Sequence, residues 1–236
     1  MSLRLVDCRP REAYEAGHVP GAVHLDPEAD LSAPVLDAAT GGRHPLPDPH
    51  VLGAAFANGG IGPGTFVLSY DEGTGWAARC WWLLRHLGHD GAGTFDVRAY
   101  EGPLEIEEPR VERAAFVPHV RSDDLIEAEE ILARLGDPSL VLLDARAPER
   151  WHGDVEPLDP VAGRIPGARN AFFEEPLPCG AAEPPEIAAY CGSGVTAAVV
   201  AQRLVLAGRD DVRLYPGSFS EWCRNPSNPI ERGDPT

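Results

Sequence analysis

Short apolar runs alternate with longer apolar patterns of helical period along this chain. The runs are rich in β-branched, aromatic and leucine residues and end at turn-forming or charged residues, which is typical of buried strands. They lie at Leu3–Val6, Phe66–Tyr70 and Thr94–Val97 in the first half, and at Leu140–Leu143, Ile187–Tyr190 and Val212–Tyr215 in the second. The alternation predicts an α/β fold in which each half is a mostly parallel sheet flanked by helices.

Two helical patterns occupy corresponding places in the two halves. WAARCWWLLRHL at residues 76–87 is followed by Gly88, and TAAVVAQRLVLA at residues 196–207 is followed by Gly208. A glycine directly after an apolar helical pattern is typical of a helix C-terminus. We therefore predict that both helices end at these glycines. For the second half we also predict a helix that begins after Ser122 as its N-cap and ends before Gly136.

An internal repeat is the strongest indication of the domain organisation. LVDCR at residues 5–9 matches LLDAR at residues 142–146, and GHVPGA at residues 17–22 matches GRIPGA at residues 163–168. Residues 106–119 are rich in Glu, Pro and Arg and have no periodicity, as in a linker. We predict domains at residues 1–105 and 120–236 with this linker between them. Asp7 and Asp144, which follow strands in both copies, are predicted to pair with nearby arginines.

Cys191 stands where a predicted strand ends and a predicted helix begins, in the turn CGSGVT at residues 191–196. The free N–H groups and the dipole of a helix N-terminus favour an anion such as a thiolate. Glycines in such a turn allow successive N–H groups to converge on one point and form an anion-binding nest. The turn therefore predicts a reactive thiolate, and the alternative is a cysteine that serves as a small buried hydrophobe.

Composition narrows the possible partners. The chain has 236 residues and a formal net charge of −17, and this charge disfavours nucleic acid and anionic membrane surfaces. The N-terminus has no apolar signal core and no apolar run approaches membrane-spanning length, so we expect a cytoplasmic protein. The five cysteines show no zinc spacing and no disulfide framework is expected, so we predict no metal. Cys179 is either a redox partner of Cys191 or a bystander, and we favour the bystander.

The sequence CGSGVTA after a strand resembles the active-site loop of the rhodanese superfamily, and in particular that of its 3-mercaptopyruvate sulfurtransferases. LYPGSFSEW, residues 214–222, is similar to the C-terminal signature of the same family. Thiosulfate-type members typically have Arg-Lys where this chain has Gly192 and Ser193, and the chain contains no lysine. The resemblance implies two tandem rhodanese-like domains. The first would be catalytically silent, because Asp71 stands where the second has Cys191 and a carboxylate cannot carry sulfur.

The resemblance also implies a mechanism. Cys191 would take a sulfane sulfur from 3-mercaptopyruvate as a persulfide and pass it to a thiol, a thioredoxin-like protein or cyanide, with no cofactor beyond this covalent intermediate. Ser193 and His44, which lies in GRHPLP, correspond to catalytic positions of the family. The partner carboxylate of His44 is either Glu28 or Asp30.

The same resemblance assigns the donor-binding residues. Gly192, Gly194 and Val195 would contribute the backbone of the anion cradle. The hydroxyl of Thr196 either reaches the site or caps the helix, and the sequence leaves both open. Arg150 matches the family arginine that binds the donor carboxylate. The second family arginine falls on Asp159, a change of sign that disfavours an anionic donor, and we predict that Arg164 supplies the missing charge.

Three alternatives remain to be compared. A thiosulfate:cyanide sulfurtransferase would use the same cysteine with another donor. A non-catalytic rhodanese-like module that binds a partner or carries sulfur would commonly lack the nucleophile. A cysteine-dependent phosphatase requires an arginine at the end of the loop, where this chain has Ala197.

Finally, the segment 174–185 is shorter than is usual in the family and has no helical pattern, so a helix is expected to be missing there.

Overall fold

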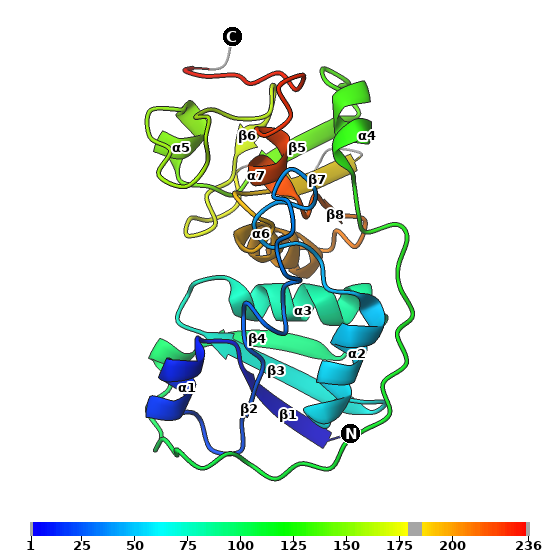
Figure 1. Cartoon of the computed structure of the whole chain (residues 1–236), viewed down its shortest axis with the longest axis vertical. Coiled ribbons are helices and arrows are strands. Elements are labelled where there is room, and N and C mark those ends of the chain that lie inside the picture. The colour runs from blue at the N-terminus through cyan, green and yellow to red at the C-terminus, as the bar shows by residue number, and fades with distance from the viewer. Residues whose placement is uncertain (1, 179–185, 235–236) are drawn as a thin grey trace. The chain divides into compact units, whose positions relative to one another are not determined.

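The computed structural model describes residues 2–178 and 186–234, and in it the chain divides into two compact units. The first unit comprises Met1–Pro34 and Leu46–Arg121, and the second comprises Val35–Pro45 and Ser122–Thr236 (Figure 1). The boundary near residue 121 follows the repeat. The sequence analysis did not foresee that Val35–Pro45, which lies within the first copy of the repeat, packs with the second unit.

The first unit contains a four-stranded parallel sheet in the order β2-β1-β3-β4. Its strands are β1 (Ser2–Asp7), β2 (Val23–His24), β3 (Thr65–Asp71) and β4 (Ala92–Asp96). Its helices are α1 (Arg11–Ala16), α2 (Pro49–Asn58), α3 (Trp76–His86) and the 3₁₀ turn η1 (Val97–Ala99). Helix α3 packs on β3 and β4.

The second unit repeats this arrangement, with a parallel sheet in the order β6-β5-β7-β8 (Figure 1). Its strands are β5 (Leu140–Asp144), β6 (Arg169–Asn170), β7 (Glu186–Tyr190) and β8 (Arg213–Leu214). Its helices are α4 (Ala128–Ala133), α5 (Pro148–His152), α6 (Thr196–Leu206) and α7 (Ser218–Trp222). The predicted α/β fold of two parallel sheets flanked by helices is thus confirmed.

The predicted long strands and helices lie within about two residues of the observed ones. The two-residue strands β2 and β6 were not predicted, because two residues are too few to show the alternation of apolar and polar positions that indicates a strand. Gly208 follows α6 with a φ of +91°, as expected of a C-cap glycine. The prediction for Ser122 is wrong: α4 begins at Ala128 with Glu127 in the N-cap position, and Leu125 forms an isolated bridge to Leu214 instead.

Each unit has its own apolar core. In the second unit, side chains of β5 and β7 pack with those of α4 and α7, and Leu142, Ala188, Ile131, Phe219 and Trp222 are all buried there. In the first unit, Tyr70 packs with Val19 and Ala22. All five residues of β5 and four of the five residues of β7 are buried, as expected for strands of a parallel sheet that is covered on both faces.

Residues 106–119, the predicted linker, contain neither helix nor strand and run along the first unit. The Ala114 N–H donates to Ala57 O at 2.9 Å and the His119 N–H donates to Leu87 O at 3.0 Å. These backbone hydrogen bonds attach the segment to the ends of α2 and α3. None of the helices in the described parts of the chain is long and apolar enough to cross a membrane.

Candidate active site

The loop from Cys191 to Val195 joins the end of β7 to the start of α6. Cys191 is 2% exposed, and its Sγ accepts hydrogen bonds from the backbone N–H groups of Gly194 at 3.1 Å and Ser193 at 3.4 Å. The sulfur therefore lies in a cradle of N–H donors at a helix N-terminus, an environment that stabilises negative charge on it.

Helix α7, which lies in the C-terminal signature, forms hydrogen bonds with the backbone of this loop. The N–H groups of Phe219 and Ser220 donate to the carbonyl oxygens of Cys191 at 3.0 Å and Gly192 at 2.9 Å. The Ser218 Oγ accepts the Cys191 N–H at 3.2 Å. Ser218 has a φ of +54°, a left-handed conformation that is costly for a residue with a side chain. The signature thus serves to hold the cysteine loop in one conformation.

The same helix fixes the segment that carries His44. Ser220 Oγ accepts the Arg43 N–H at 3.0 Å, and Glu221 Oε1 accepts the Gly41 N–H at 2.7 Å. Gly42 approaches the start of α7 so closely that an added Cβ would clash with Gly217 O. This close approach requires glycine, and the two hydrogen bonds to Ser220 and Glu221 hold the segment on the second unit.

His44 and Ser193 form a direct hydrogen bond, with 2.7 Å between Nδ1 and Oγ. Both residues belong to the second unit. A serine hydroxyl that is bonded to an imidazole can pass a proton through the ring, because either ring nitrogen can donate or accept. Two of the predicted catalytic side chains therefore lie together beside the cysteine loop.

Two guanidinium groups lie against Gly192. A Cβ added to Gly192 would be 2.8 Å from Arg43 Nη2 and 3.5 Å from both terminal nitrogens of Arg150. The side chains of Arg43 and Arg150 are 22% and 17% exposed. Arg150 is thus close to the cysteine loop, as its predicted role requires. The sequence analysis did not consider Arg43, although it directly precedes His44.

Asp159, at the position where the family has a second arginine, is surrounded by positive charge. Its side chain is fully buried, and Arg43 Nη1, Arg224 Nη1 and Arg150 Nη2 all contact it, the last two at 3.0 Å and 3.5 Å. Arg150 also donates to Glu156 Oε1 at 2.7 Å. We expected Asp159 to disfavour an anionic donor on the basis of its own charge, without its neighbours. The structure shows that its charge is offset by its neighbours.

Arg164 is in a different environment from the one predicted. It is 0% exposed, forms an ion pair with Glu231, and donates to the carbonyl oxygens of Trp151 at 3.2 Å and Gly233 at 2.7 Å. Its guanidinium also stacks on the Trp151 ring, 4.1 Å from the ring centroid. The structure does not support a contact between Arg164 and a donor, because no part of this guanidinium is accessible to a small molecule.

The remaining predicted residues lie as follows. Thr196 is the first residue of α6, and Val195 holds the N-cap position with no side-chain hydrogen bond, so the capping role proposed for Thr196 is wrong. Its role at the site stays a prediction. Glu28 and Asp30 belong to the first unit and His44 to the second, so the carboxylate partner of His44 also stays a prediction. Cys179 and most of the shortened segment lie outside the described residues.

In the first unit, the loop after β3 repeats the cradle around a carboxylate. Asp71 accepts hydrogen bonds from the Gly73 N–H at 2.9 Å, the Thr74 hydroxyl at 3.0 Å and the Ala77 N–H at 3.0 Å. The Asp71 carboxylate thus fills the nest of the first unit, as the Cys191 sulfur fills the corresponding nest of the second unit. The predicted pairs of Asp7 with Arg9 and Asp144 with Arg146 are confirmed, and each is bidentate, with Nε bonded to Oδ1 and Nη2 bonded to Oδ2.

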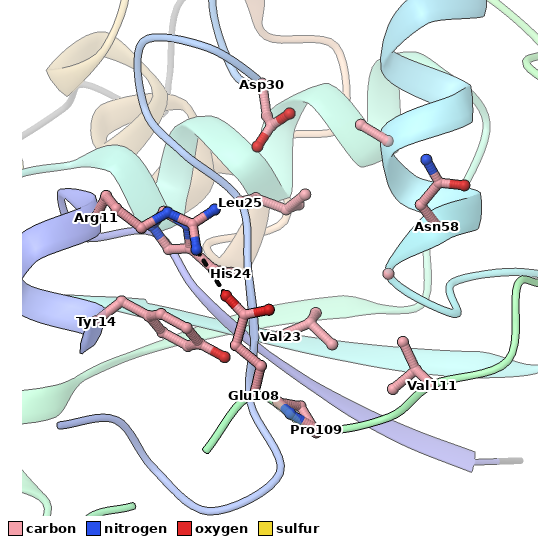
Figure 2. Close-up of a pocket in the computed structure, with 12 residues that line it drawn as sticks. Arg11, Tyr14, Val23, His24, Leu25, Asp30, Asn58, Glu108, Pro109 and Val111 are labelled. Atoms are coloured by element: carbon pink, nitrogen blue, oxygen red, sulfur yellow. Dashed lines mark hydrogen bonds and ion pairs between the residues drawn. The ribbon is translucent and has the colours of Figure 1, made fainter. Parts of the chain in front are cut away.

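A pocket of about 240 Å³ lies in the first unit and is lined only by residues of that unit. Figure 2 shows that Arg11 and Glu108 meet across it, with 2.8 Å between Nη1 and Oε1, close to Tyr14 and His24. The pocket has no cysteine among its lining residues. Within residues 2–178 and 186–234, no group of three or more His, Cys, Asp or Glu residues could hold a metal ion.

Two α/β repeats, each with a cradle of N–H donors after a central strand that holds Cys191 in the second unit and Asp71 in the first, define a protein class. The family model for the rhodanese-like domain matches residues 1–105 and 127–225. The chain therefore belongs to the rhodanese family, with two rhodanese-like domains.

Relatives of this chain are named as sulfurtransferases. The probable 3-mercaptopyruvate sulfurtransferase of Pseudomonas aeruginosa is 41% identical, over 98% of this chain and 93% of that protein. The 3-mercaptopyruvate sulfurtransferase of Escherichia coli is 30% identical, over 93% of this chain and 85% of that protein. A crystal structure of a probable thiosulfate sulfurtransferase is 35% identical, with a TM-score of 0.65 and 96% of both chains covered. These names support sulfurtransferase activity and include both donor types.

Proposed function

We propose that this protein is a sulfurtransferase that takes sulfur from 3-mercaptopyruvate and carries it as a persulfide on Cys191. The observation that carries the proposal is the cradle of the Ser193 and Gly194 N–H groups around the Cys191 sulfur. A persulfide has its negative charge on the outer sulfur, and N–H donors beside it stabilise that charge without requiring a cation.

The first half-reaction forms one bond and breaks one. The Cys191 thiolate attacks the sulfur of mercaptopyruvate, an S–S bond forms, and the C–S bond breaks with its electron pair moving to carbon. The resulting enolate takes up a proton and becomes pyruvate. The Ser193 hydroxyl, hydrogen-bonded to His44 at 2.7 Å, is suited to deliver this proton.

The second half-reaction returns the enzyme to its starting state. A thiolate acceptor, from a small thiol or a thioredoxin-like protein, attacks the outer sulfur and leaves with it as a new persulfide. Cyanide would leave as thiocyanate. In both cases the S–S bond to Cys191 breaks and its electron pair returns to the Cys191 sulfur, so no external oxidant or reductant is needed.

Arg150 is proposed to bind the carboxylate of the donor. Its Nε and Nη2 donate to Glu156, so the nitrogen that can donate to the donor carboxylate is Nη1, which lies 3.5 Å from the position of a Cβ on Gly192. Arg150→Ala should therefore raise KM for mercaptopyruvate, with a loss of about 1.5–3 kcal/mol for a charged hydrogen bond.

The direct test is intact-mass measurement after brief incubation with 3-mercaptopyruvate. We expect the mass of one added sulfur, located on Cys191 by peptide mapping and removed by cyanide. A folded Cys191→Ser variant should gain no sulfur, because an alcohol cannot hold a persulfide. If that variant transfers sulfur, the proposed nucleophile is wrong.

Thiosulfate is the second candidate donor, because the 35% identical solved structure carries that name and the arginines near Gly192 also suit a sulfur-bearing dianion. Kinetics with both donors on the same preparation separates the two. A higher kcat/KM for thiosulfate than for mercaptopyruvate would favour the second candidate.

A further inference from the structure

We propose that Arg43 is the second arginine of the donor-binding site, so that Arg43 and Arg150 together bind the anionic group of the sulfur donor above Gly192. Asp159 is a positioning residue that holds both guanidiniums there. This inference rests on the proposed function for the identity of the donor, but the existence of the anion site can be tested without it.

The first support is the close approach of both arginines to one point of the cysteine loop. Arg43 Nη2 is 2.8 Å from the position that a Cβ on Gly192 would take, and the terminal nitrogens of Arg150 are 3.5 Å from it. Any side chain at residue 192 would displace these guanidiniums. Glycine at residue 192 therefore allows both guanidinium groups to contact the backbone of the loop beside Cys191.

The second support is the local charge. Four arginines and three carboxylates form one continuous network beside the loop. The arginines are Arg43, Arg146, Arg150 and Arg224, and the carboxylates are Asp144, Glu156 and Asp159. One positive charge is therefore in excess, and a monoanionic ligand would balance it. Because the three arginines that contact Asp159 are only 17–24% exposed, water screens this excess charge less than it would on the open surface, which favours binding of an anion at this place.

The third support is incomplete hydrogen bonding at the shared carboxylate. Arg43 Nη1 and Asp159 Oδ2 are both buried and have no hydrogen-bond partner among the described residues. The contact between Arg43 and Asp159 is an ion pair without hydrogen-bond geometry. Nη1 is thus held by Asp159, and Arg43 Nη2, which faces Gly192, is the nitrogen that can donate to an incoming carboxylate.

The backbone of Arg43 is also held in place. Its N–H donates to Ser220 Oγ at 3.0 Å, and Ser220 N–H donates in turn to Gly192 O at 2.9 Å. Arg43 is thereby linked to the cysteine loop through one serine, and it directly precedes His44. The same short segment can therefore provide both a charge for the donor and the ring bonded to Ser193.

Steady-state kinetics is the first test. Arg43→Ala should raise KM for mercaptopyruvate about 10- to 100-fold with a smaller change in kcat, because the interaction is present in the ground state. Arg43→Lys should recover part of the loss, since it restores charge without the fork. Arg209→Ala is the matched control, because it removes an arginine of the second unit that pairs with Asp211, and it should leave KM unchanged. An unchanged KM in Arg43→Ala would overturn the proposal.

A double-mutant cycle tests the positioning role of Asp159. If Asp159 acts by orienting Arg43, Asp159→Asn should raise KM much less in the Arg43→Ala background than in the unmutated protein. Fully additive effects would mean that Asp159 acts independently of Arg43. Thermal unfolding of each variant accompanies the cycle, and Arg43→Gln replaces Arg43→Ala if the alanine variant does not fold.

Alkylation of Cys191 tests the anion site without sulfur transfer. The ratio of its rates with iodoacetate and iodoacetamide, followed by peptide mass, compares an anionic with a neutral reagent at the same sulfur. This ratio should fall about tenfold in Arg43→Ala, as expected for the loss of a nearby charge, and should not change in Arg209→Ala. A lower ratio together with no persulfide from mercaptopyruvate would support the anion site and reject the proposed donor. Normal persulfide formation with an unchanged ratio would reject the role of Arg43 alone.

Discussion

His44 Nδ1 and Ser193 Oγ lie 2.7 Å apart although the two residues are 149 positions apart in the sequence. The contact exists because Val35–Pro45 packs with the second unit, where Gly41 and Arg43 bond to side chains of α7. A segment that precedes most of the first unit thus completes the site of the second.

This contact predicts strong coupling between the two residues in catalysis. If Ser193 and His44 deliver one proton together, His44→Ala and Ser193→Ala should each lower kcat about 10²-fold, within the range for general acid catalysis. The double variant should be little worse than either single one, because both remove the same step. Single-turnover rates of pyruvate release would measure this. Additive losses would show that the two side chains act in separate steps.

The groups around each thiol should make Cys8, Cys191 and Cys223 unequal in reactivity, because all three are buried and the Cys191 sulfur accepts hydrogen bonds from two backbone N–H groups. Burial raises the pKa of the Cys8 thiol well above its ordinary value, and burial also raises the pKa of the Cys223 thiol. A raised pKa keeps both groups protonated near neutral pH, and each unit of elevation lowers the thiolate fraction about tenfold.

Iodoacetamide should therefore modify Cys191 much faster than Cys8 or Cys223 in the folded protein near neutral pH, and the difference should narrow as pH rises. Peptide mass spectrometry after a short pulse would measure this. Urea-unfolded protein is the control, in which all three sites should react at similar rates. Faster modification of Cys8 than of Cys191 in the folded protein would contradict the assignment.

Asp71 should contribute to the stability of the first unit. Its carboxylate is 5% exposed and accepts hydrogen bonds from two backbone N–H groups and the Thr74 hydroxyl. Asp71→Ala leaves these donors without their acceptor and should lower the free energy of unfolding by about 1–3 kcal/mol. Asp71→Asn keeps one acceptor oxygen and should cost less. Urea titration of both variants would measure the difference, and equal stability of the alanine variant and the unmutated protein would contradict it.

Arg164→Ala should affect stability rather than donor binding. The substitution removes a fully buried guanidinium that pairs with Glu231 and satisfies two carbonyl oxygens, so a loss of about 3–5 kcal/mol is expected. KM for mercaptopyruvate in the folded fraction should stay unchanged. A raised KM without loss of stability would restore the role that the sequence first indicated for this arginine.

Much of the fold and the reactive centre was predictable from contiguous residues. The alternation of apolar runs, the repeat and the turn at residues 191–196 predicted two α/β units and a cysteine at a helix N-terminus. The predicted strands and the predicted helices at residues 76–87 and 196–207 lie close to the observed ones, whereas α2 (Pro49–Asn58) was not predicted. Such features are encoded locally, because strand and helix periods and glycine turns depend on neighbours in the chain.

The partners of the charged residues depended on the tertiary structure. Arg43, Arg150 and Arg164 look alike in the sequence, yet two lie against Gly192 and the third is fully buried beside Glu231. In the sequence, the negative charge of Asp159 indicates a site that disfavours an anionic donor. In the folded chain, three guanidinium groups contact Asp159 and offset that charge. Only the folded chain decides such roles, because the strength of an ion pair depends on burial and on neighbours far away in the sequence.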